Sequence, residues 1–384
     1  MYTAILRLAA HGPSAAAVAV FAVNGALFAA WVPRIPEIKA RLEMGEAALG
    51  LALLGMPAGL LVAMTVVGWL VARLGVTRML AATLVLYAVA IVLPTLAPSP
   101  VLLAAALFFV GLGNASMDVT MNVGAAAIER RRGVAIMGAC HGGFSLGSMI
   151  GAGLAGLVAA AGIAPTPQVA AFAALIFLFG LWVIARMGEG LADEPPEAEP
   201  AFTLPPRGLL GLGVLGMGAL LIEGAMADWT AVYLREELGG GPAVGAAGFT
   251  GFSLAMAIGR FQGDTLVERI GAVRLLRLGA VTAAVGLVIG PATGNAAVAV
   301  LGFLGVGFGI ASVVPILFRA AAATPGIAPG TAIAAVASTA YLGFLLGPPL
   351  IGLVAEVIGL GPTLALLALP MAGLYAAAGT ASRL

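Results

Sequence analysis

The segment VLLAAALFFVGLGNASMDVTMNVGAAAI, residues 101–128, is the clearest indication of fold class in this chain. It is longer than the about 20 apolar residues that a helix needs to cross a bilayer, and Asp118 is its one charged residue. Similar apolar segments recur along the whole sequence, whereas a membrane β-barrel would show alternating segments of about ten residues. The sequence therefore predicts an all-α integral membrane protein.

The composition and the polar breaks define the organisation. Of 384 residues, 61% are hydrophobic and 9% are charged, whereas a soluble domain carries about 25% charged residues. The apolar segments predict twelve transmembrane helices, centred near residues 23, 59, 88, 114, 147, 177, 221, 253, 284, 307, 343 and 371. The longest polar break, RMGEGLADEPPEAEP at 186–200, has the acidic, proline-rich composition of a linker. We therefore expect an N-terminal six-helix bundle at 1–187, a cytoplasmic linker at 188–207 and a C-terminal six-helix bundle at 208–384.

The basic residues indicate the orientation in the membrane. With a cytoplasmic N-terminus, all but four of the 18 Lys and Arg residues lie on the cytoplasmic side, as the positive-inside rule requires. The exceptions are Arg34, Lys39, Arg41 and Arg235. Both termini are therefore expected in the cytoplasm. A net charge of +1 and a sequence without a basic arm argue against a nucleic-acid partner.

The two halves of the sequence repeat one another, in order and at a nearly constant offset. Three pairs of segments match: ARLGVTR (72–78) with ERIGAVR (268–274), GLGNAS (111–116) with GFGIAS (307–312), and, with one gap, NGALFAAW (24–31) with EGAMADW (223–229). Two six-helix repeats with a site between them near the bilayer midplane are an architecture of secondary transporters. We therefore expect two pseudo-symmetric bundles.

Several motifs carry a resemblance to a known family. GWLVARLGVTR (68–78) resembles the loop motif between helices two and three of the major facilitator superfamily, although Ala72 stands at its acidic position and Glu268 keeps the acid in the second copy. GNASMDVTMN, CHGGFSLGSMIGAG and EGAMADWTAVYLRE are similar to a bacterial inner-membrane branch near the fucose permeases. The resemblance implies alternating access in the bacterial inner membrane. The proline-containing fifth-helix motif of drug/proton antiporters is absent from the sequence.

Three polar residues inside residues 101–128 are the main candidates for function. Asn114, Asp118 and Asn122 are spaced i, i+4 and i+8, so they share one stripe of a helix. A charge near the bilayer centre costs on the order of 2.5–3.5 kcal/mol even on insertion scales. We interpret Asp118 as a proton-carrying carboxyl and the two asparagines as cargo-binding amides. The alternative for Asp118 is a structural hydrogen bond to a neighbouring helix.

His141 and Glu223 extend this candidate site. His141 is expected at the depth of Asp118 to Asn122 on the next helix, where it could act with Asp118 as a proton switch or serve as a packing residue. Glu223 lies mid-membrane at the position that repeats Asn24, so both are expected to bind cargo, and Glu223 could also carry protons. The alternative for Glu223 is a bond between helices.

The remaining candidates lie nearer the membrane surfaces. Asp228 and Trp229 are added to the cargo-binding set, although Asp228 could equally be a periplasmic gate or a solvated edge residue. Six residues near the cytoplasmic surface are candidates for gating: Arg73, Arg78, Arg260, Asp264, Glu268 and Arg269. Arg260 and Asp264 are spaced i, i+4, which suits a salt bridge on one helix.

No enzyme signature is present in the sequence, and neither a metal nor a cofactor is expected. GVGFG (305–309) lies inside an expected membrane helix, so it is not a nucleotide-binding loop, and ATP drive is not expected. We interpret the chain as a monomeric, proton-coupled secondary transporter of a small polar metabolite, with sugars favoured by the resemblance. A proton antiporter that exports drugs or metabolites is the alternative. Its expected partners are the cargo, protons and the lipid bilayer.

Overall fold

The computed structural model describes residues 12–187, 206 and 208–379 of the chain. These residues form helices and connecting turns without a β-strand. Twelve helical segments among them are long and apolar enough to cross a membrane, six before Met187 and six after Leu210. The predicted all-α fold with twelve membrane spans is therefore confirmed. The expected linker at 188–207 lies, apart from residue 206, outside the described residues, so its boundaries stay a prediction.

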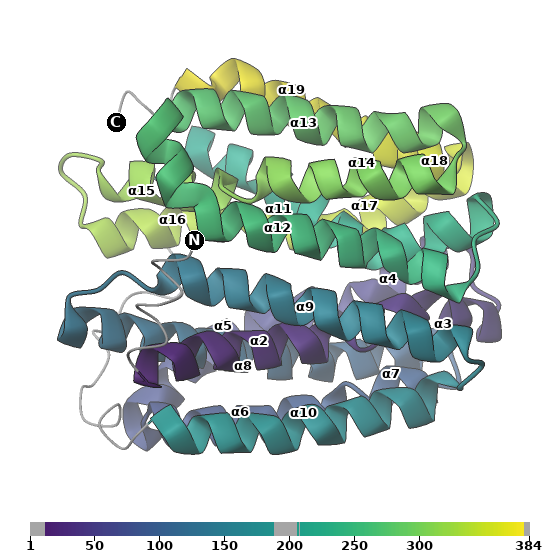
Figure 1. The fold of residues 1–384 in the computed structure, drawn as a ribbon, viewed down its shortest axis with the longest axis horizontal. Helices are drawn as coiled ribbons and strands as arrows, with labels where there is room; N and C mark the ends of the chain where they lie inside the picture. Colours follow the sequence, from purple (N-terminus) through teal and green to yellow (C-terminus); the bar gives the residue numbers. More distant parts are fainter. Residues whose placement is uncertain (1–11, 188–205, 207, 380–384) are drawn as a thin grey trace. The chain divides into compact units, whose positions relative to one another are not determined.

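The helices cluster into two compact units (Figure 1). The first unit comprises Met1–Glu43 and Ala52–Ala198 as far as these are described. Its elements are α2 (Gly12–Ala29), η1 (Val32–Arg34), α3 (Ile35–Arg41), α5 (Gly55–Leu74), α6 (Val76–Ala90), α7 (Leu93–Leu96), α8 (Pro100–Arg132), α9 (Met137–Ala160) and α10 (Pro165–Met187). Within it, α2 packs along α9 and α5 packs along α8.

The second unit comprises Met44–Leu51 and Glu199–Leu384, again as far as described. It holds most of α4 (Glu46–Leu53) and the helices α11 (Leu210–Val232), α12 (Pro242–Ile270), α13 (Ala272–Thr293), α14 (Ala296–Ile310), α15 (Val313–Ala322), α16 (Pro329–Ala340), α17 (Leu342–Ile358), α18 (Leu360–Leu366) and α19 (Ala368–Ala377). A π-helical turn, η3 (Tyr233–Glu237), ends α11. Within this unit α13 packs along α14, and α12 packs along α14 as well.

The sequence of α8 explains why this helix begins and ends where it does. The Ser99 side chain accepts a hydrogen bond from the amide of Leu102, and Pro100 occupies the first helical position. Gly133 ends the helix in the left-handed conformation, with φ of 62°. The last turn carries Arg130, Arg131 and Arg132, whose positive charges favour the negative end of the helix dipole. The helix therefore carries its polar stripe between two well-defined ends.

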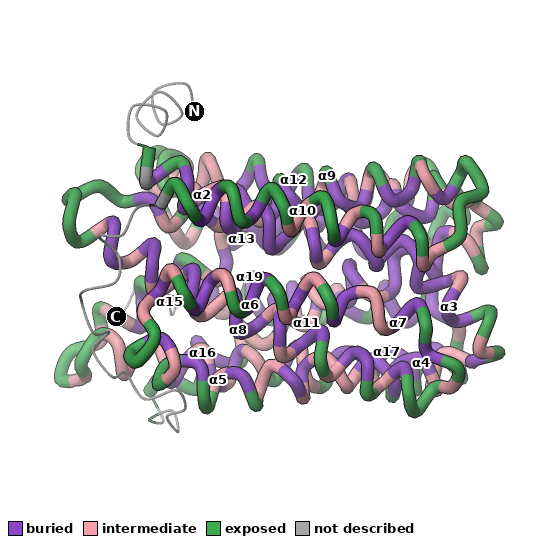
Figure 2. Tube along the Cα trace, turned by 90° about the horizontal axis from the view of Figure 1, so that it is seen from below, coloured by how far each residue is buried: buried purple, intermediate pink, exposed green. Residues whose placement is uncertain are grey.

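Close approach of α2 and α9 depends on glycine. A Cβ atom added to Gly25 would lie 2.0 Å from the carbonyl oxygen of Phe144, and one added to Gly147 would lie 2.0 Å from that of Ala22. Small residues at such crossings let two membrane helices pack backbone against backbone. Figure 2 shows buried and exposed residues interspersed along many of the helices, as expected where a helix buries one face and exposes the other. Large apolar side chains such as Leu175, Leu301 and Val357 are exposed, as lipid-facing residues are.

A buried arginine joins the end of the first span to α10. Arg34 is 1% exposed, and its Nε donates to Oε1 of Gln168 at 2.7 Å. Its other nitrogens donate to the carbonyl oxygen of Ile163 at 2.9 Å and to Glu37 at 2.9 Å. Gln168 in turn donates to the carbonyl oxygen of Ala30 at 3.1 Å. The guanidinium charge is thus compensated and hydrogen-bonded, which a buried charge requires.

Candidate functional site

The polar stripe of α8 is present as the spacing predicts. Asn114, Asp118 and Asn122 are all half-buried. The Nδ2 atom of Asn122 lies 2.9 Å from the backbone oxygen of Asp118 and 3.3 Å from its Oδ1. The side-chain amide of Asn122 therefore contacts both the backbone oxygen and the carboxyl group of Asp118, which lies four positions earlier on the helix.

Asn114 belongs to a hydrogen-bonded cluster that joins three helices. Its Nδ2 atom donates to Oδ1 of Asn24 on α2 at 2.8 Å and to the hydroxyl oxygen of Tyr87 on α6 at 3.0 Å. Nδ2 of Asn24 donates to the sulfur of Met121 on α8 at 3.6 Å. Asn24 is fully buried, at 0% exposure. In this conformation Asn24 therefore contacts protein groups, and its expected cargo contact stays a prediction.

His141 lies on α9, which contacts α8 within the first unit. Its ring meets that of Phe21 edge to face, with centroids 5.3 Å apart. Its backbone oxygen accepts a hydrogen bond from Ser145 at 3.2 Å. His141 is half-buried. The structure thus places His141 on the neighbouring helix to Asp118, as the sequence predicts, and packs it against α2.

In the second unit Glu223 has a partner that its sequence does not suggest. Nη2 of Arg260 on α12 lies 3.0 Å from Oε1 and 3.3 Å from Oε2 of Glu223 on α11. The two side chains are 14% and 21% exposed, respectively. The i, i+4 spacing suggests Arg260 as the partner of Asp264, and the structure shows Asp264 accepting a hydrogen bond from Arg319 on α15. Both Asp264 and Arg319 are exposed.

Asp228 and Trp229 differ in accessibility although they are adjacent. Trp229 is 0% exposed, and its indole nitrogen has no hydrogen-bond partner among the described residues. Trp31, the matching residue of the first repeat, is 1% exposed and has the same unpartnered indole nitrogen. Asp228 is half-buried. In this conformation Asp228 is therefore partly exposed, whereas the Trp229 side chain is enclosed by protein, and the cargo contacts of both residues stay predictions.

The other gating candidates lie at the surface. Arg73, Arg78, Glu268 and Arg269 are all exposed. The guanidinium of Arg73 lies over the ring of Trp69, 4.3 Å from its centroid, which is a cation–π contact. The gating role of these residues stays a prediction.

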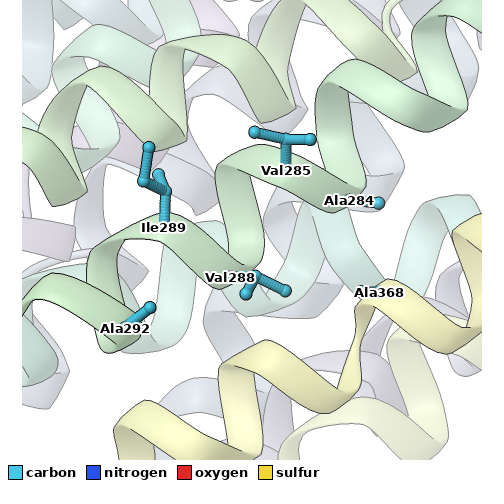
Figure 3. A pocket seen from close by; sticks show the side chains of 6 residues that line it. All are labelled: Ala284, Val285, Val288, Ile289, Ala292 and Ala368. Carbon is cyan, nitrogen blue, oxygen red and sulfur yellow. The ribbon is translucent and has the colours of Figure 1, made fainter.

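A groove on the second unit is too apolar to serve as the site for a polar cargo. It has a volume of about 480 Å³ and is lined by Ala284, Val285, Val288, Ile289 and Ala292 of α13 and by Ala368 of α19 (Figure 3). None of these side chains offers a hydrogen bond. Val285, Val288 and Ile289 are exposed, as lipid-facing residues are. Within the described ranges, no three His, Cys, Asp or Glu side chains gather as a metal site would require.

Sequence reasoning missed two residues of these clusters, Tyr87 and Met121, and one pairing, that of Arg260 with Glu223. Tyr87 and Met121 have no spacing signal, because their partners lie 27 and 97 positions away in the sequence. The Arg260–Glu223 pair spans 37 positions. A useful signal would have been the charge balance of the membrane spans, since an arginine at depth requires an acidic partner.

Comparison with known proteins identifies the family. The model of the Major Facilitator Superfamily matches residues 15–318. An uncharacterized MFS-type transporter of Yersinia pestis is 32% identical over 363 residues, which cover 94% of each chain. The solved structure of the nucleoside transporter NupG is similar with a TM-score of 0.70 at 12% identity, over 97% of this chain and 100% of that one.

A second solved structure agrees with the first. A bacterial homolog of the human lysosomal transporter Spinster gives a TM-score of 0.71 at 14% identity, over 96% of each chain. At such identities the solved structures show the fold, whereas the family model and the Yersinia pestis relative show the family. The sequence-based resemblance to this superfamily is confirmed, and the protein is a membrane transporter rather than an enzyme. The chain belongs to the major facilitator superfamily.

Proposed function

We propose that this transporter is a proton-coupled secondary carrier that moves a small polar, sugar-like metabolite across the bacterial inner membrane by alternating access. The observation that carries the proposal is a carboxyl group inside a membrane-spanning helix, Asp118, whose Oδ1 lies 3.3 Å from the amide of Asn122. Ionisable residues in membrane spans are rare and mark cargo or proton pathways. Asp118 is the main proton carrier in this proposal.

The shared amide of Asn122 provides a link between proton and cargo. When Asp118 is ionised, its Oδ1 attracts the N–H of Asn122, as a charged acceptor does. When Asp118 takes up a proton, this attraction weakens and the N–H becomes available to a cargo oxygen. Protonation and cargo binding then favour one another, which is the reciprocal coupling that symport requires. His141 on the neighbouring helix biases the charge state of Asp118.

The cargo-binding groups of the first unit are uncharged amides, which favours a neutral cargo with several hydroxyl groups. Asn114 and Asn122 contact the cargo directly, and Asn24 acts by holding Asn114. The resemblance to the fucose permease branch favours sugars. The similar fold of the nucleoside transporter NupG adds nucleosides, which contain a sugar, as a further class to test.

The second unit contributes charge compensation and an accessible carboxyl group. The Glu223 carboxylate is balanced by Arg260 in this conformation, so Glu223 is the reserve proton site rather than the main one. Asp228 completes the cargo contacts from α11. Trp229 joins them in a conformation in which its buried indole is released.

The remaining roles follow the sequence-based expectations. Arg73, Arg78, Arg260, Asp264, Glu268 and Arg269 act at the cytoplasmic gate. Both termini lie in the cytoplasm, and the protein acts as a monomer whose partners are its cargo, protons and lipid.

The test is uptake by purified protein in liposomes, using labelled monosaccharides, nucleosides and other small polar metabolites. Each compound is offered with an imposed pH gradient of either sign and without one. Accumulation driven by a proton gradient in the same direction supports symport, and accumulation driven by the opposite gradient supports the antiport alternative. Accumulation that is independent of the pH gradient and is driven by a sodium gradient would overturn the proposal of proton coupling.

A further inference from the structure

The amide of Asn114 has both of its donors occupied by protein groups. Nδ2 carries two hydrogens, one directed to Oδ1 of Asn24 at 2.8 Å and one to the hydroxyl of Tyr87 at 3.0 Å. Oδ1 of Asn114 accepts no hydrogen bond from a described residue, and it does not belong to the buried polar atoms that lack a partner. This oxygen therefore reaches accessible space.

The donor and acceptor properties of the neighbouring groups, rather than the positions of the amide atoms, determine the direction of these hydrogen bonds. The N and O atoms of an asparagine side chain are interchangeable in shape, so each amide orientation must be assigned from its partners. If both amides were reversed, Asn24 would donate to Asn114, and Asn114 would turn its NH2 group to the open side. The hydroxyl of Tyr87 accepts or donates equally well, so it does not distinguish the two arrangements.

Met121 distinguishes the two possible arrangements of the Asn24 and Asn114 amides. A thioether sulfur can accept a hydrogen bond but has no hydrogen to donate. The atom of Asn24 that lies 3.6 Å from this sulfur must therefore be Nδ2, because a carbonyl oxygen in that place would be buried without a donor, which is costly. Asn24 then turns Oδ1 to Asn114, and Asn114 must turn Nδ2 to Asn24.

We propose that Met121 and Tyr87 act as positioning residues for Asn114. Met121 orients Asn114 through Asn24, and Tyr87 accepts the second N–H of Asn114 directly. Asn114 therefore offers the cargo a hydrogen-bond acceptor and no donor. The proposal rests on the proposed role of Asn114 in cargo binding and narrows the cargo class. The cargo group at Asn114 is a hydroxyl or an N–H, as in sugars and nucleosides. A carboxylate, phosphate or ether oxygen at this place would face the Asn114 oxygen without a hydrogen between them.

The test measures the orientation of the Asn114 side chain in the absence of cargo. Its result can therefore be interpreted even if the proposed function is wrong. The chain contains four asparagines, Asn24, Asn114, Asn122 and Asn295. Selective ¹⁵N labelling of asparagine gives four pairs of side-chain NH2 signals in solid-state NMR of the protein in lipid bilayers. Asn114→Ala identifies the pair that belongs to Asn114. Exchange of these protons with D2O is then followed.

We expect both Asn114 side-chain protons to exchange at least about tenfold more slowly than those of the exposed Asn295, because both are hydrogen-bonded inside the unit. Met121→Leu keeps the volume of the side chain but removes the sulfur acceptor, so the reversed arrangement becomes available and Asn114 exchange accelerates towards that of Asn295. Met117→Leu is the matched control, because Met117 lies one turn earlier on α8 and is equally buried. It leaves Asn114 exchange unchanged.

Two results would overturn the proposal. If the Asn114 protons of the native protein exchange as fast as those of Asn295, the amide turns its donors to the open side. If Met121→Leu and Met117→Leu leave Asn114 exchange equally slow, the sulfur does not set the orientation.

Discussion

Nη2 of Arg260 lies between the two carboxylate oxygens of Glu223, 3.0 Å from one and 3.3 Å from the other, and joins α12 to α11 inside the second unit. Both residues lie in membrane-spanning segments, where a lone charge is costly. The pair therefore compensates two charges that neither helix could carry alone. Glu223 occupies the position that repeats Asn24 of the first unit, so equivalent positions carry an ion pair in one unit and an uncharged amide cluster in the other.

Glu223→Gln should destabilise the protein. The substitution keeps the shape of the side chain but removes the carboxylate charge that pairs with the largely buried Arg260. Breaking a buried ion pair from one side costs about 3–5 kcal/mol, which should appear as a lower melting temperature in detergent. Arg260→Gln should lower the melting temperature in the same way.

The double variant Glu223→Gln, Arg260→Gln provides the control for this pair. It removes both charges together and should recover much of the stability that either single variant loses. If the losses of the two single variants simply add in the double variant, the pair does not stabilise the second unit, and each residue acts independently.

Gln168→Leu should lower the stability of the first unit. Gln168 accepts from Nε of the fully buried Arg34 and donates to the carbonyl oxygen of Ala30. Its loss leaves a buried charged donor and a buried acceptor unsatisfied, at about 1–3 kcal/mol or more. The matched control is Gln262→Leu, because Gln262 is half-buried without a hydrogen bond to a described residue. Equal melting temperatures for the two variants would contradict the role of Gln168.

Asp264→Asn should change the stability little. Asp264 and Arg319 are 63% and 60% exposed, and exposed ion pairs contribute about 0–1 kcal/mol. If Asp264 acts at the gate, the variant should instead alter the rate of counterflow exchange in liposomes. An unchanged exchange rate together with an unchanged melting temperature would remove Asp264 and its partner from the gate.

Tyr87→Phe should weaken cargo binding while leaving expression unaffected. The substitution removes the hydroxyl that accepts from Asn114 at 3.0 Å, and a neutral hydrogen bond contributes about 0.5–1.5 kcal/mol. The affinity for a transported compound should fall by a factor of about 2–10, since 1.4 kcal/mol corresponds to tenfold. Native affinity in Tyr87→Phe, measured by competition in counterflow, would show that the hydroxyl does not position Asn114.

The fold could be predicted because it depends on segment length, hydrophobicity and internal repeats, which are visible in the sequence itself. Apolar segments of bilayer length and the repeated motifs indicate twelve helices in two halves. The i, i+4, i+8 spacing likewise placed Asn114, Asp118 and Asn122 on one stripe of α8, since helical geometry is local.

The partners of these residues could not be predicted, because they depend on how helices rotate about their axes and slide along one another. The spacing suggested Asp264 for Arg260, whereas the structure brings Glu223 to Arg260 from another helix and Arg319 to Asp264. Asn24 lies at the expected helical position, but its side chain is enclosed by Asn114 and Met121. Small residues such as Gly25 permit the close helix contact that encloses α2, and the sequence does not state which helix that contact involves.

The most direct test of the account is the transport behaviour of Asp118→Asn in liposomes, measured in two ways on the same protein preparation. The variant mimics the protonated carboxyl, so it should bind cargo and support counterflow exchange at a rate near that of the native protein. It should not accumulate cargo against its gradient when a pH gradient is imposed, because Asn cannot release a proton. Glu43→Gln serves as the matched control, because Glu43 is an exposed carboxylate with no proposed role in transport, and this variant should retain pH-driven accumulation. Full pH-driven accumulation by Asp118→Asn would contradict the account and would make Glu223 the leading proton carrier.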